Sequence, residues 1–114
     1  MSDYFAVYDN TRLVGFGVVG FQAMVKGQIS SDDLLDVGLG MNPDLIRKGN
    51  GREFTSVVLL GATKIAKEGG FHGLRCAILD WNIVSQKMAT IQGFNHSRDI
   101  ANELGLFKEY ESPF

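Results

Sequence analysis

Short polar clusters divide the N-terminal part of the chain into apolar runs of strand length. Tyr4–Tyr8 is aromatic, Asp9–Arg12 is a turn cluster, and Leu13–Val25 is rich in Val, Phe and Gly. This pattern predicts a β-hairpin. The polar stretch Gly27–Asp33 predicts a surface loop, and Leu34–Met41 predicts a third strand after it.

In the next segment, Gly51–Lys67, apolar positions recur every three or four residues, which predicts an amphipathic helix. The residues expected on its buried face are Phe54, Val57, Val58, Ala62 and Ile65. The Gly69–Gly70 pair is expected to end this helix.

The rest of the chain predicts a strand, a helix and a weakly patterned tail. Leu74–Leu79 is apolar except for Arg75 and predicts a strand. Asn82 is expected to cap a helix that runs to Gln92. The tail, Phe94–Phe114, predicts one or two weak strands. The order of strand, glycine-containing loop, helix and strand before this tail predicts a right-handed crossover between parallel strands.

Composition narrows the class of protein. The chain has 114 residues, 45% hydrophobic and 21% charged, which predicts one globular domain over residues 1–114. Its net charge of −2 supplies no positive field, so nucleic acid is not an expected partner. The sequence shows no signal peptide and no apolar run of membrane-spanning length. The single cysteine, Cys76, suits a reducing cytoplasm, where we expect the protein to act.

The loop before the long helix carries the clearest candidate chemistry. Asn42–Arg52 contains two glycines and three cations, followed at once by the expected helix N-terminus. Backbone N–H groups freed by glycine, together with the helix dipole, can cradle a phosphate. A solvated basic turn explains the same composition equally well. Gly15–Gly20 has the spacing of a dinucleotide fingerprint but lies in a predicted hairpin, where alternating glycines instead clear one face of a strand.

Two motifs together resemble the GNAT superfamily of acetyl-CoA-dependent N-acetyltransferases. Met41–Gly51 is similar to the family's strand end, proline and loop pattern Arg/Gln-x-x-Gly-x-Gly. Asn82–Phe94 has the family's spacing from an Asn that opens a helix to a Gly-Phe pair that closes it. The resemblance covers about Tyr4–Phe94 and implies an α/β (α+β) fold with a mixed, mostly antiparallel sheet flanked by helices.

The resemblance also implies acetyl-CoA as cosubstrate and a primary amine as acceptor. No metal is expected, because His72 and His96 have no partners at the spacing of metal ligands. In such a fold the loop N–H groups bind the pyrophosphate, and the preceding strand pairs with the pantetheine arm. The residues that this assigns to the cofactor are Leu39, Gly40, Met41, Ile46, Arg47, Lys48, Gly49, Asn50, Gly51, Arg52 and Asn82. For Asn82, a plain helix cap is the alternative.

The sequence departs from the family pattern in three respects. Ile46 occupies the usual Arg or Gln position of the loop, and Ala89 stands where many members carry a Tyr that protonates the departing thiolate. No counterpart of the family's leading strand and two helices precedes Tyr4. These features keep open a second interpretation, a non-catalytic CoA-binding or dimerisation module.

The general base and the assembly are predicted from position alone. Asp36 and Asp80, near the start and after the end of two strands, are the candidate bases, although strand-end aspartates are often solvated turn residues. A homodimer is expected to cover apolar residues near Leu13–Val25 and on the long helix at 57–60, unless the tail folds back over them.

Overall fold

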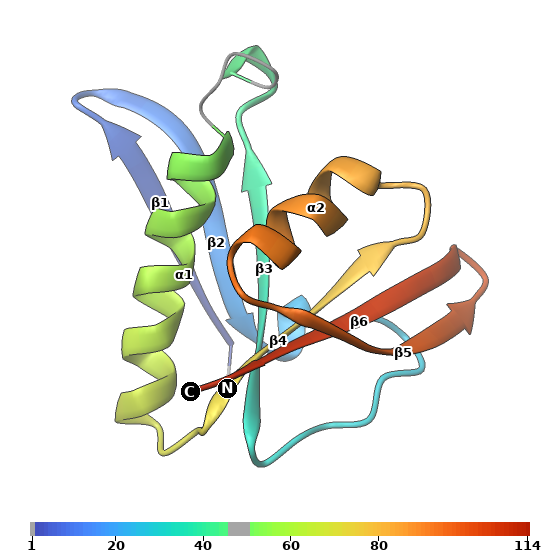
Figure 1. Cartoon of the computed structure of the whole chain (residues 1–114). Helices are drawn as coiled ribbons and strands as arrows, with labels where there is room; N and C mark the ends of the chain where they lie inside the picture. Colours follow the sequence, from blue (N-terminus) through green and yellow to red (C-terminus); the bar gives the residue numbers. More distant parts are fainter. Residues whose placement is uncertain (1, 46–50) are drawn as a thin grey trace.

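The computed structural model describes residues 2–45 and 51–114 (Figure 1). It begins with the predicted hairpin, formed by β1 (Ser2–Asp9) and β2 (Arg12–Gly20). Asn10 turns the chain with a φ of 57°, a conformation that Asn tolerates better than most residues. The expectation that the second strand reaches Val25 is wrong. Gly20, at φ 92° and ψ −150°, turns the chain out of the strand into the 3₁₀ turn η1 (Phe21–Ala23).

The next three elements form the predicted crossover. β3 (Leu34–Met41) follows the expected loop, and the 3₁₀ turn η2 (Pro43–Leu45) comes after it. Helix α1 (Gly51–Glu68) ends at the glycine pair, where Gly70 has a φ of 80°. β4 (Gly73–Leu79) then lies parallel to β3. The predicted strands and helix are confirmed here to within a residue at each end.

The C-terminal half adds α2 (Ile83–Ile91), β5 (Asn95–Asn102) and β6 (Gly105–Pro113). The tail forms two full strands rather than weak ones, because β6 pairs with the whole length of β4 on one side and with β5 on the other. The sheet order is β1-β2-β3-β4-β6-β5, and β3–β4 is its parallel pair. The expected mixed, mostly antiparallel sheet is confirmed.

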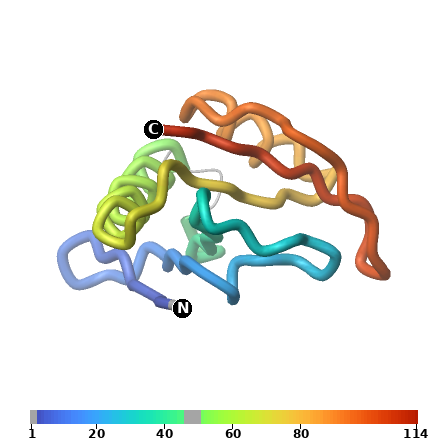
Figure 2. Tube along the Cα trace, turned by 90° about the horizontal axis from the view of Figure 1, so that it is seen from below, coloured from blue at the N-terminus to red at the C-terminus, as the bar shows by residue number. Residues whose placement is uncertain are grey.

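Both helices pack on one face of the strongly twisted sheet (Figures 1 and 2). The stripe that α1 turns to the sheet consists of Phe54, Val58, Ala62 and Ala66, spaced by one helical turn. The apolar spacing predicts Val57 on this face as well, but Val57 is exposed, because it lies to one side of that stripe. The same face receives Ala89 of α2.

Glycines on β2 permit the close approach of α1. A Cβ at Gly15 would meet the Phe54 ring at 2.7 Å, and one at Gly17 would meet Val58 at 2.8 Å. The alternating glycines therefore clear one face of a strand for a neighbour, as predicted. Within the described residues, no helix is long and apolar enough to cross a bilayer.

Candidate functional site

Strand β3 changes its pairing partner halfway along its length, and this opens the sheet. Its first residues, Leu34–Asp36, pair with β4, while Val37–Met41 pair with β2 on the opposite side. Beyond Asp36, the described part of the chain contains no strand paired with the β4-facing edge of β3. β4 follows β6 instead, so β3 and β4 diverge below α2 (Figure 1).

A cavity of about 280 Å³ lies where the two strands diverge. Its walls come from β3, β4, both helices and Phe107 of β6, so segments far apart in the sequence meet here. The lining is mostly apolar, and its polar side chains are Thr55, Cys76, Asn82 and Ser85. Such a cavity suits a ligand that is largely apolar but carries a few groups able to form hydrogen bonds.

Several residues predicted to hold a cofactor meet at this opening. Leu39 and Asn82 line the cavity. Gly40 and Met41 continue the open edge of β3. The remaining predicted positions follow the same end of β3: Gly51 and Arg52 begin α1, and Ile46, Arg47, Lys48, Gly49 and Asn50 lie outside the described residues.

Asn82 caps α2, as its position predicts. Its Oδ1 accepts a hydrogen bond from the Ser85 backbone N–H at 3.2 Å. Gln86 ties the same helix to the end of β4, because its Nε2 donates to the Asp80 carbonyl at 2.7 Å. These bonds fix the first turn of α2 over the cavity.

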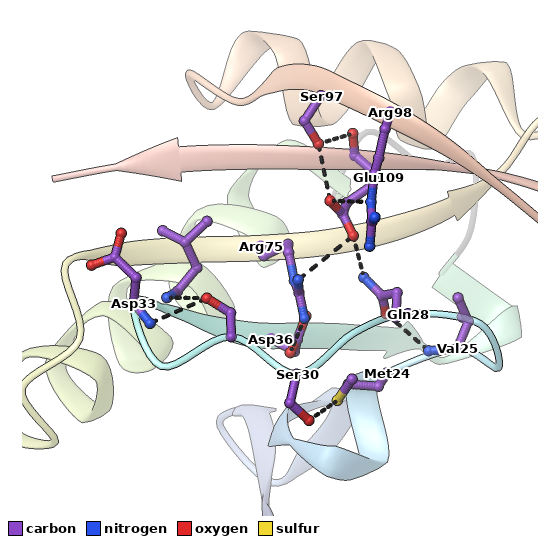
Figure 3. Close-up of polar contacts among 12 residues, drawn as sticks. Met24, Val25, Gln28, Ser30, Asp33, Asp36, Arg75, Ser97, Arg98 and Glu109 are labelled. Carbon is purple, nitrogen blue, oxygen red and sulfur yellow. Dashed lines mark hydrogen bonds and ion pairs between the residues drawn. The ribbon is translucent and has the colours of Figure 1, made fainter.

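Asp36 lies at the point where the sheet opens, but its carboxylate does not line the cavity. It is buried and accepts two bonds from Arg75, at 2.7 Å from Nε and 2.9 Å from the second guanidinium nitrogen (Figure 3). The hydrogen bond to Asp36 raises the pKa of Arg75 against the opposing effect of burial. A base needs a free lone pair facing its substrate, so this geometry favours a structural role for Asp36.

Arg75 also faces Glu109, which is 2% exposed and 3.7 Å away. Burial alone would raise the pKa of Glu109, but hydrogen bonds from Gln28, Arg98 and Ser97 and the charge of Arg75 hold it below its ordinary value. Figure 3 shows this cluster, with Arg75 between Asp36 and Glu109. Among the described residues, no buried side-chain polar atom lacks a hydrogen-bond partner.

Asp80 follows β4 and is half exposed, 3.6 Å from Lys108. It does not line the cavity either. The two histidines contact carboxylates on the surface, His72 with Asp33 and His96 with Asp99. Among the described residues, no group of three or more His, Cys, Asp or Glu side chains could hold a metal ion.

Ser85 and Cys76 also line the cavity, and the sequence motifs assign neither of them to the site. Burial raises the pKa of the Cys76 thiol to about 12, and the charges of Asp36 and Glu109 add to this effect. Cys76 is therefore a neutral thiol at physiological pH. The sequence does hold a signal for Ser85 in its spacing: it lies one helical turn before Ala89 and shares a helix face with it.

Comparison with solved structures identifies the fold. The chain is similar to the Campylobacter jejuni N-acetyltransferase PseH, solved with acetyl-CoA, with a TM-score of 0.71 and 15% identity over 98% of this chain and 67% of that one. It is similar to a GNAT-family structure from Bordetella pertussis, with a TM-score of 0.73 and 14% identity over 96% of this chain and 64% of that one. It is also similar to a chimeric form of the spermidine N-acetyltransferase SpeG of Vibrio cholerae, with a TM-score of 0.75 and 14% identity over 98% of this chain and 69% of that one.

The chain therefore has the GNAT fold, as the resemblance in its sequence implied. Nearly all of this chain aligns with these structures, and it spans about two thirds of their length. No family model and no curated protein matches its sequence.

Proposed function

We propose that this chain is an acetyl-CoA-dependent N-acetyltransferase that acts on a primary amine. The observation that carries the proposal is the open edge of β3, which faces a cavity lined by Leu39 and Asn82. The resemblance of the sequence to the GNAT superfamily assigns both residues to the cofactor. Support also comes from the fold, which the chain shares with N-acetyltransferases such as PseH.

The described residues fit the chemistry of acetyl-CoA. An arm that contains amide groups can pair with an unpaired strand edge as an added strand would, and Leu39–Met41 provide such an edge. The pyrophosphate would lie at the N-terminus of α1, whose dipole favours anions. There Gly51 and Arg52 would act together with the predicted loop residues 46–50. Among the described residues, the nearest atom that a Cβ at Gly51 would meet is the Met88 methyl carbon, at 3.8 Å.

Bound acetyl-CoA supplies an activated acetyl thioester. The chain's part is to hold the thioester carbonyl near backbone N–H groups of β3, which can stabilise the developing oxyanion, and to exclude water. A base must take one proton from the attacking amine. Neither predicted aspartate lines the cavity, and Arg75 occupies both oxygens of Asp36, so Asp80, half exposed just after β4, is the remaining candidate of the two.

The proposal is tested in two steps on the same preparation. Thermal melting with and without acetyl-CoA reports binding, and thiol release in the presence of a panel of amines reports transfer. The panel includes spermidine, because one structural neighbour is a spermidine N-acetyltransferase. A higher melting temperature with acetyl-CoA, together with amine-dependent thiol release, is the expected result. An unchanged melting temperature and no thiol release would refute the proposal.

A second candidate, a non-catalytic CoA-binding module, is favoured by Ala89. This residue lines the cavity and has no group able to donate a proton. The experiment above separates the two candidates, because a module would show the shift in melting temperature without thiol release from any amine in the panel.

We also propose that the domain acts in the cytoplasm as a homodimer. Val57 and Leu60 of α1 are exposed, as are Tyr4 and Phe16 on the hairpin. Val58, which the sequence pattern places on the dimer face, is instead fully buried against the sheet. Light scattering at micromolar concentration tests the assembly: a particle of 12.5 kDa would refute it.

A further inference from the structure

The cavity closes at the point where β3 and β4 stop pairing. Asp36 and Arg75 form the last residue pair between the two strands. Val37 and Cys76 come directly after this pair and line the cavity, one from each strand. The sheet therefore bounds the cavity at this end, and the strands diverge away from it (Figure 1).

This closed end of the cavity is apolar. We define it by Val37, Leu59, Cys76, Ala89 and Phe94, which all line the cavity and lie in or against the hydrophobic core. The Phe94 N–H donates a hydrogen bond to the Ala89 carbonyl at 3.0 Å, which holds these two walls together. Burial raises the pKa of the Cys76 thiol to about 12, so it stays neutral and resembles a small apolar side chain. The closed end therefore favours an apolar ligand group, because a polar group buried there would lose its hydrogen bonds to water.

The other polar side chains of the lining belong to the starts of the two helices. The Thr55 hydroxyl donates to the carbonyl of Gly51, the first residue of α1. Asn82 and Ser85 lie at the start of α2. A Cβ at Gly51 would lie 3.8 Å from the Met88 methyl carbon, so the lining residue Met88 borders the start of α1. The proposed pyrophosphate site is at this second end of the cavity.

The two ends are joined by α1 and β3. From its first residue, α1 runs back toward the end where β3 pairs with β4 (Figure 1), and Leu59 follows Thr55 by one helical turn. The open edge of β3 leads the same way, from Leu39 to Val37. An arm that pairs with β3 and keeps its pyrophosphate at the start of α1 would therefore end with its acyl group at the closed end.

We propose that the closed end is an acyl pocket, and that the chain takes unbranched acyl groups longer than acetyl, such as propionyl and butyryl, from their CoA thioesters. This inference rests on the proposed function and names the class of donor that the same site accepts. Ala89 determines the depth of the pocket on the α2 side, because its side chain is a single methyl group, and Leu59 limits it from α1.

The longer groups are transferred by the same balanced step. The amine nitrogen forms a bond to the acyl carbonyl carbon, and the carbon–sulfur bond breaks with its electron pair going to sulfur. The amine loses one proton to the base and the thiolate gains one from solvent, so an amide and free CoA are formed. The added methylene groups take no part in these bonds, and their effect is on binding.

The test measures binding in the absence of an amine, so that no transfer occurs. Calorimetry gives the Kd of wild-type protein for acetyl-CoA, propionyl-CoA and butyryl-CoA. Each methylene group buried at the closed end should lower Kd about fourfold, as expected when one CH₂ leaves water, and butyryl-CoA should bind about fifteenfold more tightly than acetyl-CoA. Thiol release with the same three donors, using the amine that the panel identifies, should give a higher kcat/KM for butyryl-CoA than for acetyl-CoA.

Two variants narrow the pocket from opposite walls. Ala89→Leu fills it from α2, and Leu59→Phe fills it from α1, at a position that is only half buried. Thr90→Leu is the matched control, because it adds the same side chain to the next position of α2, which is exposed and does not line the cavity. Within each protein, the Kd for acetyl-CoA is divided by the Kd for butyryl-CoA, so that any effect on the shared CoA portion cancels.

The ratio should stay near its wild-type value in Thr90→Leu and fall to about one or below in both pocket variants. If Ala89→Leu does not fold, the ratio in Leu59→Phe decides. Butyryl-CoA that binds wild-type protein no more tightly than acetyl-CoA would overturn the inference and leave the proposed function intact. An unchanged ratio in the pocket variants would also overturn it, since the acyl chain would then lie elsewhere. Wild-type protein that binds none of the three thioesters and releases no thiol would overturn both.

Discussion

Replacing Arg75 by methionine tests whether the buried ion cluster stabilises the fold. Methionine has a similar length but no donor, so Arg75→Met removes both hydrogen bonds to Asp36 and the charge 3.7 Å from Glu109. Glu109 keeps Gln28, Ser97 and Arg98 as partners. Asp36, in contrast, has no other hydrogen-bond partner for its carboxylate among the described residues, so its buried charge is left uncompensated.

The expected cost is large for a chain of this size. Breaking one side of a buried ion pair costs about 3–5 kcal/mol. The entropy of unfolding is about 2.1 cal/mol/K per residue, which for 114 residues amounts to about 0.24 kcal/mol/K. The melting temperature should therefore fall by roughly 12–21 °C. Calorimetric or circular-dichroism melts measure this fall directly.

Lys26→Met is the matched control for this experiment. Lys26 and Glu103 form an ion pair of 2.8 Å, close to the shorter Arg75–Asp36 distance of 2.7 Å, but their side chains are 74% and 65% exposed. Such a solvated pair contributes little to stability, so the melting temperature should fall far less than in Arg75→Met. Similar small shifts in both variants would refute the reasoning, because burial would then not determine the cost. Restoration of stability in the double variant Asp36→Leu/Arg75→Met would support it further.

Three further predictions concern the site and the acid range. Gly51→Glu should abolish acetyl-CoA binding in calorimetry while the melting temperature stays near wild type, since among the described residues a Cβ at position 51 meets only Met88, at 3.8 Å, and the added carboxylate repels the anion; unchanged affinity would contradict the predicted cradle. Ala89→Tyr introduces a donor beside the cavity and should raise turnover with little change in KM for acetyl-CoA; a flat rate would remove position 89 from the mechanism. Glu109 has a lowered pKa in the folded state, so its stabilisation is complete above its unfolded value of about 4.5 and is lost as the pH falls below it. The urea concentration at the unfolding midpoint should therefore decline as the pH falls below about 4.5, and it should decline less steeply in Glu109→Gln than in wild type. Parallel curves of midpoint against pH for the two proteins would contradict this.

Much of the fold could be predicted from the sequence, because local signals mark most element ends. Glycine pairs, a capping Asn and apolar spacing identify α1, α2, β3 and β4 to within a residue or two. The error at β2 arises because Val, Phe and Gly continue past Gly20 in composition, whereas the backbone conformation of that glycine turns the strand. The two C-terminal strands look weak in the sequence because their stability comes from pairing rather than from their own residues: β6 pairs with distant β4, and β5 pairs with β6.

The amino-acid sequence alone nominates residues for a cofactor, since its resemblance to the GNAT superfamily assigns Leu39 and Asn82 to acetyl-CoA. What surrounds these residues depends on the folded chain. The change of partner along β3 opens the cavity, and no local pattern encodes it, because pairing depends on strands far away in the chain. The same holds for Asp36: its position makes it a candidate base, but a cation on the neighbouring strand occupies both its oxygens. Burial and partners set the chemistry of a carboxylate, and both arise only when distant segments pack together.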